Sequence, residues 1–338
     1  MKNNNVHNLF MSRCIDIARK GYGTAYPNPC VGCVIVYENR IIAEACSSEY
    51  GGNHAEINAI NKVRNKKILE KSTLYVTLEP CCHHGKTPPC SQAIIKNRFP
   101  IVVIGTIDTS EKVKGKGILE LKKNNINVIT GVLEKECTEL HKNFLCFHEK
   151  KRPYIILKWA ESRDHFIYNK NITKSKNKWI STKKSRQLVH KWRSMENAIL
   201  VGYNTVINDN PRLNVRHWEG NNPVRIVIDP NDELNKDYNI FNLHAKTIKI
   251  SRKNINLNNP LAKEIIKVLY QNKIQSVIVE GGKKTLESFI NTNLWDEARV
   301  FTNNRMLRGG IYSPKIEGKI FNTKKIDDDV LKIIYPLL

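Results

Sequence analysis

The segment from His54 to Cys90 carries the residue types and the spacing of a zinc site. It reads H-A-E at 54–56 and, after a strand-like T-L-Y-V-T, continues as L-E-P-C-C-H-H-G-K-T-P-P-C at 78–90. Catalytic zinc takes three protein ligands of nitrogen or sulfur type and keeps a fourth position for water. His54, Cys81 and Cys90 supply that set. The segment therefore predicts a catalytic zinc centre.

Glu56 is the predicted general acid and base of this centre. Bound zinc lowers the pKa of its water to roughly 7, and a nearby carboxylate can shuttle the proton. Residues two apart on a helix do not share a face, so His54 and Glu56 converge only if a helix begins at that point. The following apolar residues fit such a helix: Ile57, Ala59, Ile60 and Val63.

A second helix is expected to begin at Cys90. This cysteine follows Pro88 and Pro89 and precedes S-Q-A-I-I-K. The positive end of a helix favours a thiolate. The predicted zinc centre would thus rest on the N-termini of two helices.

The motif H-x-E followed by P-C and a second cysteine is typical of zinc deaminases that act on nucleobases. Here the usual short C-x-x-C is replaced by the longer Cys81–Cys90 loop. This loop carries polar and cationic groups, which favour a substrate that bears phosphate: His83, His84, Lys86 and Thr87. With Y-P-N-P-C-V-G-C-V-I-V at 26–36, these motifs resemble the deaminase half of the bifunctional riboflavin-biosynthesis deaminase/reductase.

The resemblance implies an N-terminal cytidine-deaminase-like α/β/α zinc domain. It places the zinc ligands at His54, Cys81 and Cys90, with Glu56 as the catalytic residue. It also implies substrate-binding residues, among them the asparagine of the N-P motif that contacts the pyrimidine: Asn28, His83, Lys86 and Thr87. The family usually has serine after the first zinc cysteine, and Cys82 stands there in this chain. We expect Cys82 not to ligate the metal.

The length of 338 residues predicts two domains, each large enough for its own core. We place their boundary at E-K-K-R-P, which gives a deaminase domain at 1–150 and a second domain at 151–338. The nine cysteines all precede residue 147, which argues against a disulfide framework and for a reduced compartment. With neither a long apolar run nor a signal peptide, the sequence favours a cytoplasmic protein without membrane contacts.

The net charge of +23 invites a nucleic-acid interpretation, because a basic surface is typical of nucleic-acid-binding proteins. Lysine and asparagine are spread through the whole chain, however, and no RNA- or DNA-binding signature is present. The excess charge instead favours small anionic substrates. The predicted partners are phosphoribosyl pyrimidines and not nucleic acid. The oligomeric state stays open, a homo-oligomer included.

The second half alternates strands with helices, which predicts a doubly wound α/β sheet. Strands are expected at 154–160, 198–202, 224–229 and 276–280. Helices are expected after Ser181 or Thr182, at about 260–272 and after the turn Gly281-Gly282. No G-x-G-x-x-G fingerprint follows a strand. Physical reasoning says only that V-E-G-G ends a strand and opens a helix, and such a turn can bind an anion.

Four runs in this half resemble the reductase half of the same family: L-K-W-A-E-S, K-W-I-S, G-Y-N-T-V-I-N-D-N-P-R-L-N-V-R and V-I-V-E-G-G. That half is similar in fold to dihydrofolate reductase and binds NADPH without the fingerprint. The resemblance implies the cofactor-binding residues Lys158, Ala160, Trp179, Thr205, Asp209, Gly281 and Gly282. It implies the substrate-binding residues Arg193, Leu213, Arg216 and Glu280.

The chain departs from the family at two places. The family's S-L-D-G is replaced by Ser162-Arg163-Asp164-His165, and a serine before the W-I run is replaced by Asn177. Losing the turn glycine predicts a reshaped loop over the cofactor.

The sequence thus predicts a bifunctional enzyme of riboflavin biosynthesis. The first domain would hydrolytically deaminate 2,5-diamino-6-ribosylamino-4(3H)-pyrimidinone 5′-phosphate to 5-amino-6-(5-phosphoribosylamino)uracil, and the second would use NADPH to reduce the ribose to ribitol. One alternative is a chain that retains only one activity. A nucleic-acid-editing deaminase would not need the long loop or the second domain. A structural zinc module would need four ligands and would leave Glu56 idle.

Overall fold

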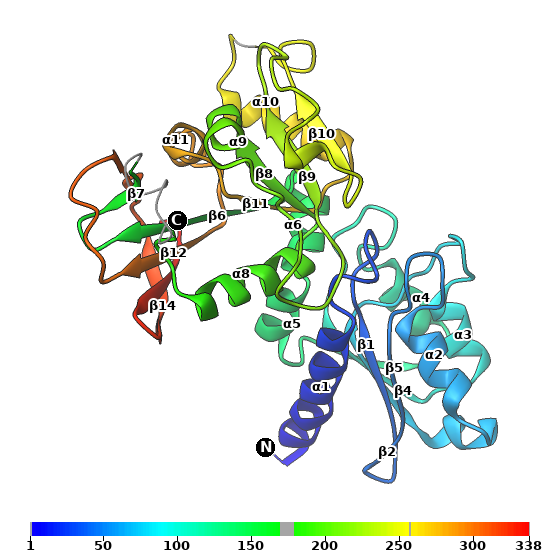
Figure 1. Ribbon diagram of the computed structural model, residues 1–338. Coiled ribbons are helices and arrows are strands. Elements are labelled where there is room, and N and C mark those ends of the chain that lie inside the picture. Colours follow the sequence, from blue (N-terminus) through cyan, green and yellow to red (C-terminus); the bar gives the residue numbers. More distant parts are fainter. Residues whose placement is uncertain (1, 170–178, 257, 338) are drawn as a thin grey trace. The chain divides into compact units, whose positions relative to one another are not determined.

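The computed structural model describes residues 2–169, 179–256 and 258–337. It divides into two compact units, Met1–Lys151 and Arg152–Leu338 (Figure 1). Asn177, one of the two departures from the family pattern, lies outside the described residues. Among the described residues, we find no helix with the length and apolar character that a membrane crossing requires.

The first unit contains a mixed sheet with the strand order β2-β1-β3-β4-β5. Strand β1 pairs antiparallel with β2 and β3, whereas β3, β4 and β5 run parallel. The runs V-I-V-Y and I-I-A-E-A, separated by E-N-R, predict a hairpin, which is confirmed as β1 and β2. The strand bounds are β1 (Gly32–Tyr37), β2 (Arg40–Cys46), β3 (Thr73–Leu78), β4 (Ile101–Thr106) and β5 (Asn127–Thr130).

Helices cover both faces of this sheet because neighbouring residues of a strand point to opposite sides. In β1, Cys33 and Ile35 pack with α2, α3 and α4, whereas Val34 and Val36 pack with α1 and α5. Figure 1 shows the same three layers, which confirm the predicted α/β/α arrangement. The helices are α1 (Lys2–Lys20), α2 (Ala55–Lys62), the 3-10 helix η1 (Lys66–Lys71), α3 (Cys90–Lys96), α4 (Lys116–Lys123), α5 (Glu134–Leu140) and α6 (Lys142–Lys150).

The largely polar sequence from Glu134 to about Lys150 predicts one long helix that closes the first domain, and this prediction is wrong. The structure has two helices there, α5 and α6, which are separated at His141. The His141 side chain is buried, and its Nε2 lies 3.0 Å from Thr77 Oγ1 in β3. Burial lowers the pKa of His141 to about 3, so the imidazole is neutral. A polar side chain thus turns inward at the break, which a hydrophobic period alone does not reveal.

The described residues of the second unit form a large sheet with the strand order β10-β9-β8-β11-β6-β12-β15-β14. The strands from β10 to β12 in this order run parallel, and β15 and β14 are antiparallel. The bounds are β6 (Tyr154–Ser162), β8 (Ala198–Gly202), β9 (Val224–Ile228), β10 (Thr247–Ile250), β11 (Ser276–Val279), β12 (Glu297–Asn303), β14 (Lys319–Ile326) and β15 (Asp329–Tyr335). A small separate pair joins β7 (Phe166–Tyr168) and β13 (Ile311–Tyr312).

This sheet is also covered on both faces, as the doubly wound prediction requires. Helices α10 and α11 pack through Ile265, Leu269 and Phe289, and α9 packs on the opposite face through Val206. Thr182 caps α8, because its Oγ1 accepts a hydrogen bond from the Ser185 backbone N–H at 3.3 Å. The helices are α8 (Lys183–Met195), α9 (Tyr203–Asp209), the 3-10 helix η2 (Asn239–Phe241), α10 (Leu261–Gln271) and α11 (Lys283–Ile290).

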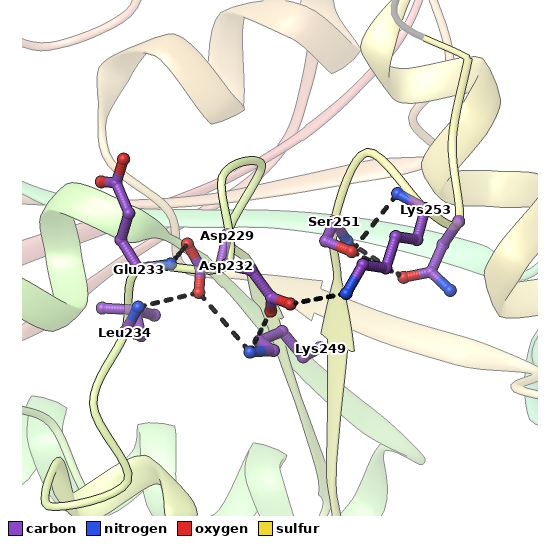
Figure 2. A network of polar contacts seen from close by, with 8 residues as sticks. Asp229, Asp232, Glu233, Leu234, Lys249, Ser251 and Lys253 are labelled. Carbon is purple, nitrogen blue, oxygen red and sulfur yellow. Dashed lines mark hydrogen bonds and ion pairs between the residues drawn. The ribbon is translucent and has the colours of Figure 1, made fainter.

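The turn after β9 is held by a buried carboxylate (Figure 2). Asp229 is fully buried and accepts hydrogen bonds from the backbone N–H groups of Glu233 and Leu234, at 3.1 and 3.0 Å. Asp232 in the same turn forms ion pairs with Lys249 of β10 and with Lys253, the latter at 3.2 Å. This network closes the carboxyl ends of the two outermost parallel strands.

The last 28 or so residues, which the sequence leaves uninterpreted, contain the antiparallel β14–β15 hairpin. Strand β14 is exposed along almost its whole length. Asp329 at the start of β15 is fully buried: it accepts hydrogen bonds from the Thr182 backbone N–H at 2.8 Å and from Asn303 Nδ2 at 2.6 Å. The hairpin is therefore tied to the start of α8 and to β12.

We expect Asp329→Ala to destabilise the protein by roughly 2 to 4 kcal/mol, since two donors lose their acceptor. Urea denaturation of the variant measures this change in the free energy of unfolding. Asp328→Ala is the matched control, because Asp328 is exposed on the same turn. Equal stability of the two variants would show that the hairpin is not anchored through Asp329.

Candidate active sites

The three predicted zinc ligands lie together in the first unit. His54 Nδ1 lies 3.5 Å from Cys81 Sγ and 3.3 Å from Cys90 Sγ. All three potential ligand atoms lie within 4.8 Å of one another. Tetrahedral zinc, with bonds of about 2.0 Å to nitrogen and 2.3 Å to sulfur, separates such atoms by roughly 3.6 Å. The side chains therefore fit a zinc ion without rearrangement.

Local structure positions each of these side chains as the sequence predicts. His54 is the N-cap residue of α2, Cys81 follows β3, and Cys90 is the first residue of α3. The Cys90 backbone N–H donates to the Cys81 sulfur at 3.4 Å. Hydrogen bonding from the Cys90 side chain outweighs the opposing effect of burial and lowers the pKa of Cys81 to about 4. A thiolate is the form in which cysteine binds a metal.

Glu56 lies in the first turn of α2, beside the three ligands, and is only 3% exposed. Burial, reinforced by the nearby Cys81 sulfur, raises the pKa of Glu56 to about 7. A carboxyl group with such a pKa can both accept and release a proton near neutral pH. The position and environment of Glu56 therefore suit an acid/base group next to a metal.

Glu79, which the sequence analysis did not single out, fixes the backbone that leads to Cys81. Its carboxylate accepts hydrogen bonds from the backbone N–H groups of Asp108, Gly115 and Ile118, at 3.3, 2.9 and 3.2 Å. A methyl group on Gly117 would lie 2.1 Å from the Pro80 carbonyl oxygen, so only glycine lets α4 come this close. The position of this glutamate in L-E-P-C, directly before the first zinc cysteine motif, was the sequence signal that could have pointed to it.

The loop between Cys81 and Cys90 presents further polar groups. His83 Nδ1 is buried and has no hydrogen-bond partner among the described residues. Lys86 is exposed, with its Nζ 3.9 Å from the centre of the Tyr50 ring. The Thr87 carbonyl accepts a hydrogen bond from the Gly85 backbone N–H at 3.2 Å. Tyr50 was not anticipated from the sequence.

Two further residues of the first unit that the sequence analysis singles out, Cys82 and Asn28, make contacts of their own. The Cys82 sulfur points to the Lys112 carbonyl at 3.7 Å and does not belong to the group of metal-ligand atoms in the described chain. Asn28 is half-buried, and its backbone N–H donates to the Ala25 carbonyl at 2.9 Å. The non-ligand role of Cys82 and the pyrimidine contact of Asn28 stay predictions.

In the second unit, glycines follow the carboxyl ends of adjacent parallel strands. Gly202 ends β8, and Gly281 and Gly282 follow β11. A methyl group on Gly202 or on Gly281 would approach the Thr285 side chain to 2.7 or 2.6 Å, and one on Gly282 would lie 3.6 Å from Thr205 Oγ1. Open α/β sheets bind ligands at such strand ends. The glycines and their close packing at these strand ends fit a dinucleotide.

Charged side chains from three segments meet next to these glycines. Arg193 of α8 and Glu280 form an ion pair at 2.7 Å, and each side chain is 11% exposed. Burial raises the pKa of Glu280, but the charges of Arg193 and Lys158 outweigh it and hold the pKa at about 2. Burial lowers the pKa of Lys158, and Glu280 opposes that shift. Glu280 is thus a carboxylate between two cations.

The Leu213–Arg216 segment lies against this group. Arg193 Nη1 donates to the Asn214 carbonyl at 3.4 Å, and Arg216 Nη1 donates to the Asn214 side-chain oxygen. Leu213 is buried with a φ of +51°, and Arg216 is exposed. Arg193 and Arg216 therefore converge on Asn214.

The remaining predicted cofactor residues lie on separate elements. Trp179 is 54% exposed, lies 5.1 Å from the Arg186 guanidinium and accepts a hydrogen bond at its carbonyl from Arg305. Ala160 is half-buried in β6. Asp209 is exposed at the end of α9. Their contacts to a cofactor stay predictions.

The turn that lacks the family's glycine is nevertheless closed. His165 adopts the left-handed conformation, with a φ of +62°, and its Nδ1 lies 3.1 Å from Glu161 Oε1. Asp164 accepts hydrogen bonds from Ser162 Oγ at 2.6 Å and from the backbone N–H groups of Leu307 and Arg308. These contacts hold a conformation that usually favours glycine.

Comparison with known proteins matches a different family model to each unit. Residues 4–106 match the cytidine and deoxycytidylate deaminase zinc-binding region, and residues 153–322 match the RibD C-terminal domain. The riboflavin biosynthesis protein RibD of Aquifex aeolicus is 37% identical over 318 residues, which cover 89% of this chain and 88% of that protein. The chain belongs to the RibD family. The RibD of Actinobacillus pleuropneumoniae is 32% identical over 95% of this chain and 93% of its own.

Solved structures of RibD proteins have the same fold. The diaminohydroxyphosphoribosylaminopyrimidine deaminase/5-amino-6-(5-phosphoribosylamino)uracil reductase of Thermotoga maritima has a TM-score of 0.90 at 36% identity and covers 99% of this chain and 100% of its own. RibD of Acinetobacter baumannii has a TM-score of 0.87 at 26% identity, with the same coverage. The predicted family, fold class and bifunctional deaminase and reductase activities, with zinc and NADPH as cofactors, are confirmed.

We expect the purified protein to hold one zinc ion per chain, because three ligands and a water complete a tetrahedron. Cys81→Ser and Cys90→Ser should lower the zinc content sharply. Cys82→Ser is the matched control and should retain zinc, since its sulfur points to Lys112. Atomic absorption of the dialysed proteins measures this. Loss of zinc from Cys82→Ser would contradict the assignment of Cys81 as the ligand and would assign Cys82 instead.

Proposed function

We propose that this chain hydrolytically removes the 2-amino group of 2,5-diamino-6-ribosylamino-4(3H)-pyrimidinone 5′-phosphate and then reduces the ribose of the product to ribitol. The observation that carries the first step is the His54, Cys81 and Cys90 cluster with Glu56 buried beside it. The second step is supported by the Lys158, Glu280 and Arg193 group at the strand ends.

In the first step, Glu56 is the proton carrier. His54, Cys81 and Cys90 would hold a zinc ion, which would lower the pKa of a bound water so that this water could attack the ring carbon at neutral pH. Glu56 takes one proton of this water and delivers it to the ring nitrogen. It then takes the remaining hydroxyl proton of the adduct and passes it to the amino group, which leaves as ammonia while the carbonyl forms. A pKa of about 7, raised by burial, suits both directions of transfer.

The substrate contacts of the deaminase are proposed on the loops around the metal. Asn28 holds the pyrimidine. Lys86 supplies a positive charge for the 5′-phosphate, helped by Thr87, because lysine binds phosphate well as a point charge. The buried Nδ1 of His83 lacks a partner among the described residues, and a substrate polar group can supply one.

In the second step, bound NADPH would supply the hydride that reduces carbon 1 of the ribose. Gly281, Gly282 and Thr205 are proposed to lie against the cofactor, since the glycines allow close backbone approach. The further cofactor contacts are proposed at Lys158, Ala160, Trp179 and Asp209.

The substrate of the reductase is proposed to lie between Arg193, Leu213, Arg216 and Glu280. Glu280 is ionised because Arg193 and Lys158 flank it, so it can accept hydrogen bonds from sugar hydroxyls. Arg216 is exposed and suits the phosphate, because a guanidinium binds phosphate oxygens in a bidentate way.

We further propose that the enzyme acts in the cytoplasm on small phosphoribosyl pyrimidines, without a nucleic-acid or membrane partner, and that it is a homo-oligomer if it assembles at all. None of the nine cysteines, all of which lie among the described residues, forms a disulfide, in keeping with a reduced compartment.

We expect Glu56→Gln to keep its zinc and to lose deamination by roughly 10²- to 10⁴-fold, because the acid/base group is missing. Ammonia release from the diaminopyrimidine phosphate, measured without NADPH, tests this. Reduction of pre-deaminated product should continue at the wild-type rate and serves as the internal control. Retained deamination in a zinc-replete variant would remove Glu56 from the mechanism.

We expect Arg216→Ala to raise the KM of the reductase for its phosphorylated substrate about tenfold or more, because a lost charged hydrogen bond costs about 1.5 to 3 kcal/mol. NADPH oxidation with pre-deaminated product measures it. Arg212→Ala is the matched control, since Arg212 is an exposed arginine of the same loop. Ammonia release should be unchanged in both. A wild-type KM for Arg216→Ala would place the phosphate elsewhere.

A further inference from the structure

Helix α8 presents two side chains, one turn apart, to the same short segment. His190 and Arg193 are three residues apart and therefore lie on one face of the helix. His190 Nδ1 accepts a hydrogen bond from the Arg216 backbone N–H at 3.0 Å. Arg193 Nη1 donates to the Asn214 carbonyl at 3.4 Å. His190 is only 4% exposed, so its hydrogen bond is shielded from water.

The segment held in this way has no regular structure of its own. Residues 210–216 form neither helix nor strand, and Leu213 has a φ of +51°. The Val215 backbone N–H donates to Asn222 Oδ1 at 2.7 Å. Backbone groups of three successive residues thus bond to side chains: Asn214 to Arg193, Val215 to Asn222 and Arg216 to His190. The place of Arg216 depends on these side chains.

The contact requires a neutral imidazole with its proton on Nε2, because Nδ1 must offer a lone pair to the N–H group. Burial, followed by the charges of Arg193, Arg216 and His217, lowers the pKa of His190 to about 3, and only Glu280 opposes the shift. The His217 ring lies edge-on to His190, with 4.7 Å between the ring centres. His190 is therefore neutral near pH 7 and can keep its acceptor there.

We propose that His190 is a positioning residue of the reductase: through the Arg216 backbone it holds the 213–216 segment so that Arg216 meets the substrate phosphate. The inference rests on the proposed role of Arg216. It extends that role to a side chain that acts through the Arg216 backbone.

The effect of losing His190 should appear in substrate binding. The phosphate is remote from carbon 1 of the ribose, so its contacts contribute equally to the ground state and the transition state. Without the acceptor, an N–H group loses its partner in a buried place and the segment shifts. We expect the KM for pre-deaminated product to rise about tenfold, with kcat and the KM for NADPH within about twofold of wild type.

The test compares His190→Phe with His190→Asn. Phenylalanine keeps the ring packing without an acceptor, whereas the asparagine side-chain oxygen can accept near the position of Nδ1. We expect the tenfold rise in His190→Phe and a KM within about threefold of wild type in His190→Asn. His217→Phe is the matched control and should have the wild-type KM. A wild-type KM for His190→Phe, or equal damage in His190→Asn, would overturn the proposal.

A second measurement decides the proposal without a variant. Nitrogen-15 NMR of the labelled wild-type protein should show the His190 Nδ1 unprotonated and the Nε2 protonated throughout pH 5 to 8. The opposite tautomer, or titration in this range, would contradict it. Arg216→Ala separates the two claims: a wild-type KM for that variant refutes the phosphate site itself, whereas a raised KM together with an unaffected His190→Phe refutes only the role of His190.

If His190 acts through Arg216, the two substitutions must not add. The double variant His190→Phe/Arg216→Ala should have a KM close to that of Arg216→Ala alone, since the positioned group is already missing. A KM that equals the product of the two single effects would show that His190 acts independently of Arg216.

Discussion

One turn in each unit depends on the same constraint: backbone groups beyond the carboxyl end of a parallel strand need hydrogen-bond partners where the chain leaves the sheet. Glu79 meets this need after β3, where it accepts hydrogen bonds from three backbone N–H groups and leads into Cys81. Asp229 does the same after β9 (Figure 2). Because buried backbone groups must be paired, these turns are rigid, and side chains placed on them hold their positions.

The two sites use buried charge in opposite ways. Next to the zinc ligands, burial, followed by the charge of Cys81, raises the pKa of Glu56 to about 7, and His54 opposes this shift. In the reductase unit, Glu280 lies between Arg193 and Lys158 and stays ionised. Breaking a buried ion pair leaves an uncompensated charge, so Arg193 and Glu280 act as one unit that also supports Asn214.

A substitution at a special backbone position need not abolish the turn that carries it. His165 occupies the place of the family's glycine, and its left-handed conformation is stabilised by Glu161 on the neighbouring strand and by the hydrogen bonds of Asp164. These side-chain contacts thus offset the conformational cost of replacing glycine, and a comparison of motifs does not reveal them.

The sequence by itself determined the candidate zinc ligands, the start of α2 at His54 and the start of α3 at Cys90. It also determined the alternation of strands and helices that buries both faces of each sheet. These features depend on local spacing and periodicity. It did not determine the helix break at His141 or the backbone hydrogen bonds that Glu79 accepts. It also did not determine the β14–β15 hairpin, which contacts the start of α8 through Asp329. Those features join residues far apart in the chain. Only the tertiary structure decides which polar side chains satisfy which distant backbone groups, because that choice depends on three-dimensional packing and leaves no periodic signal.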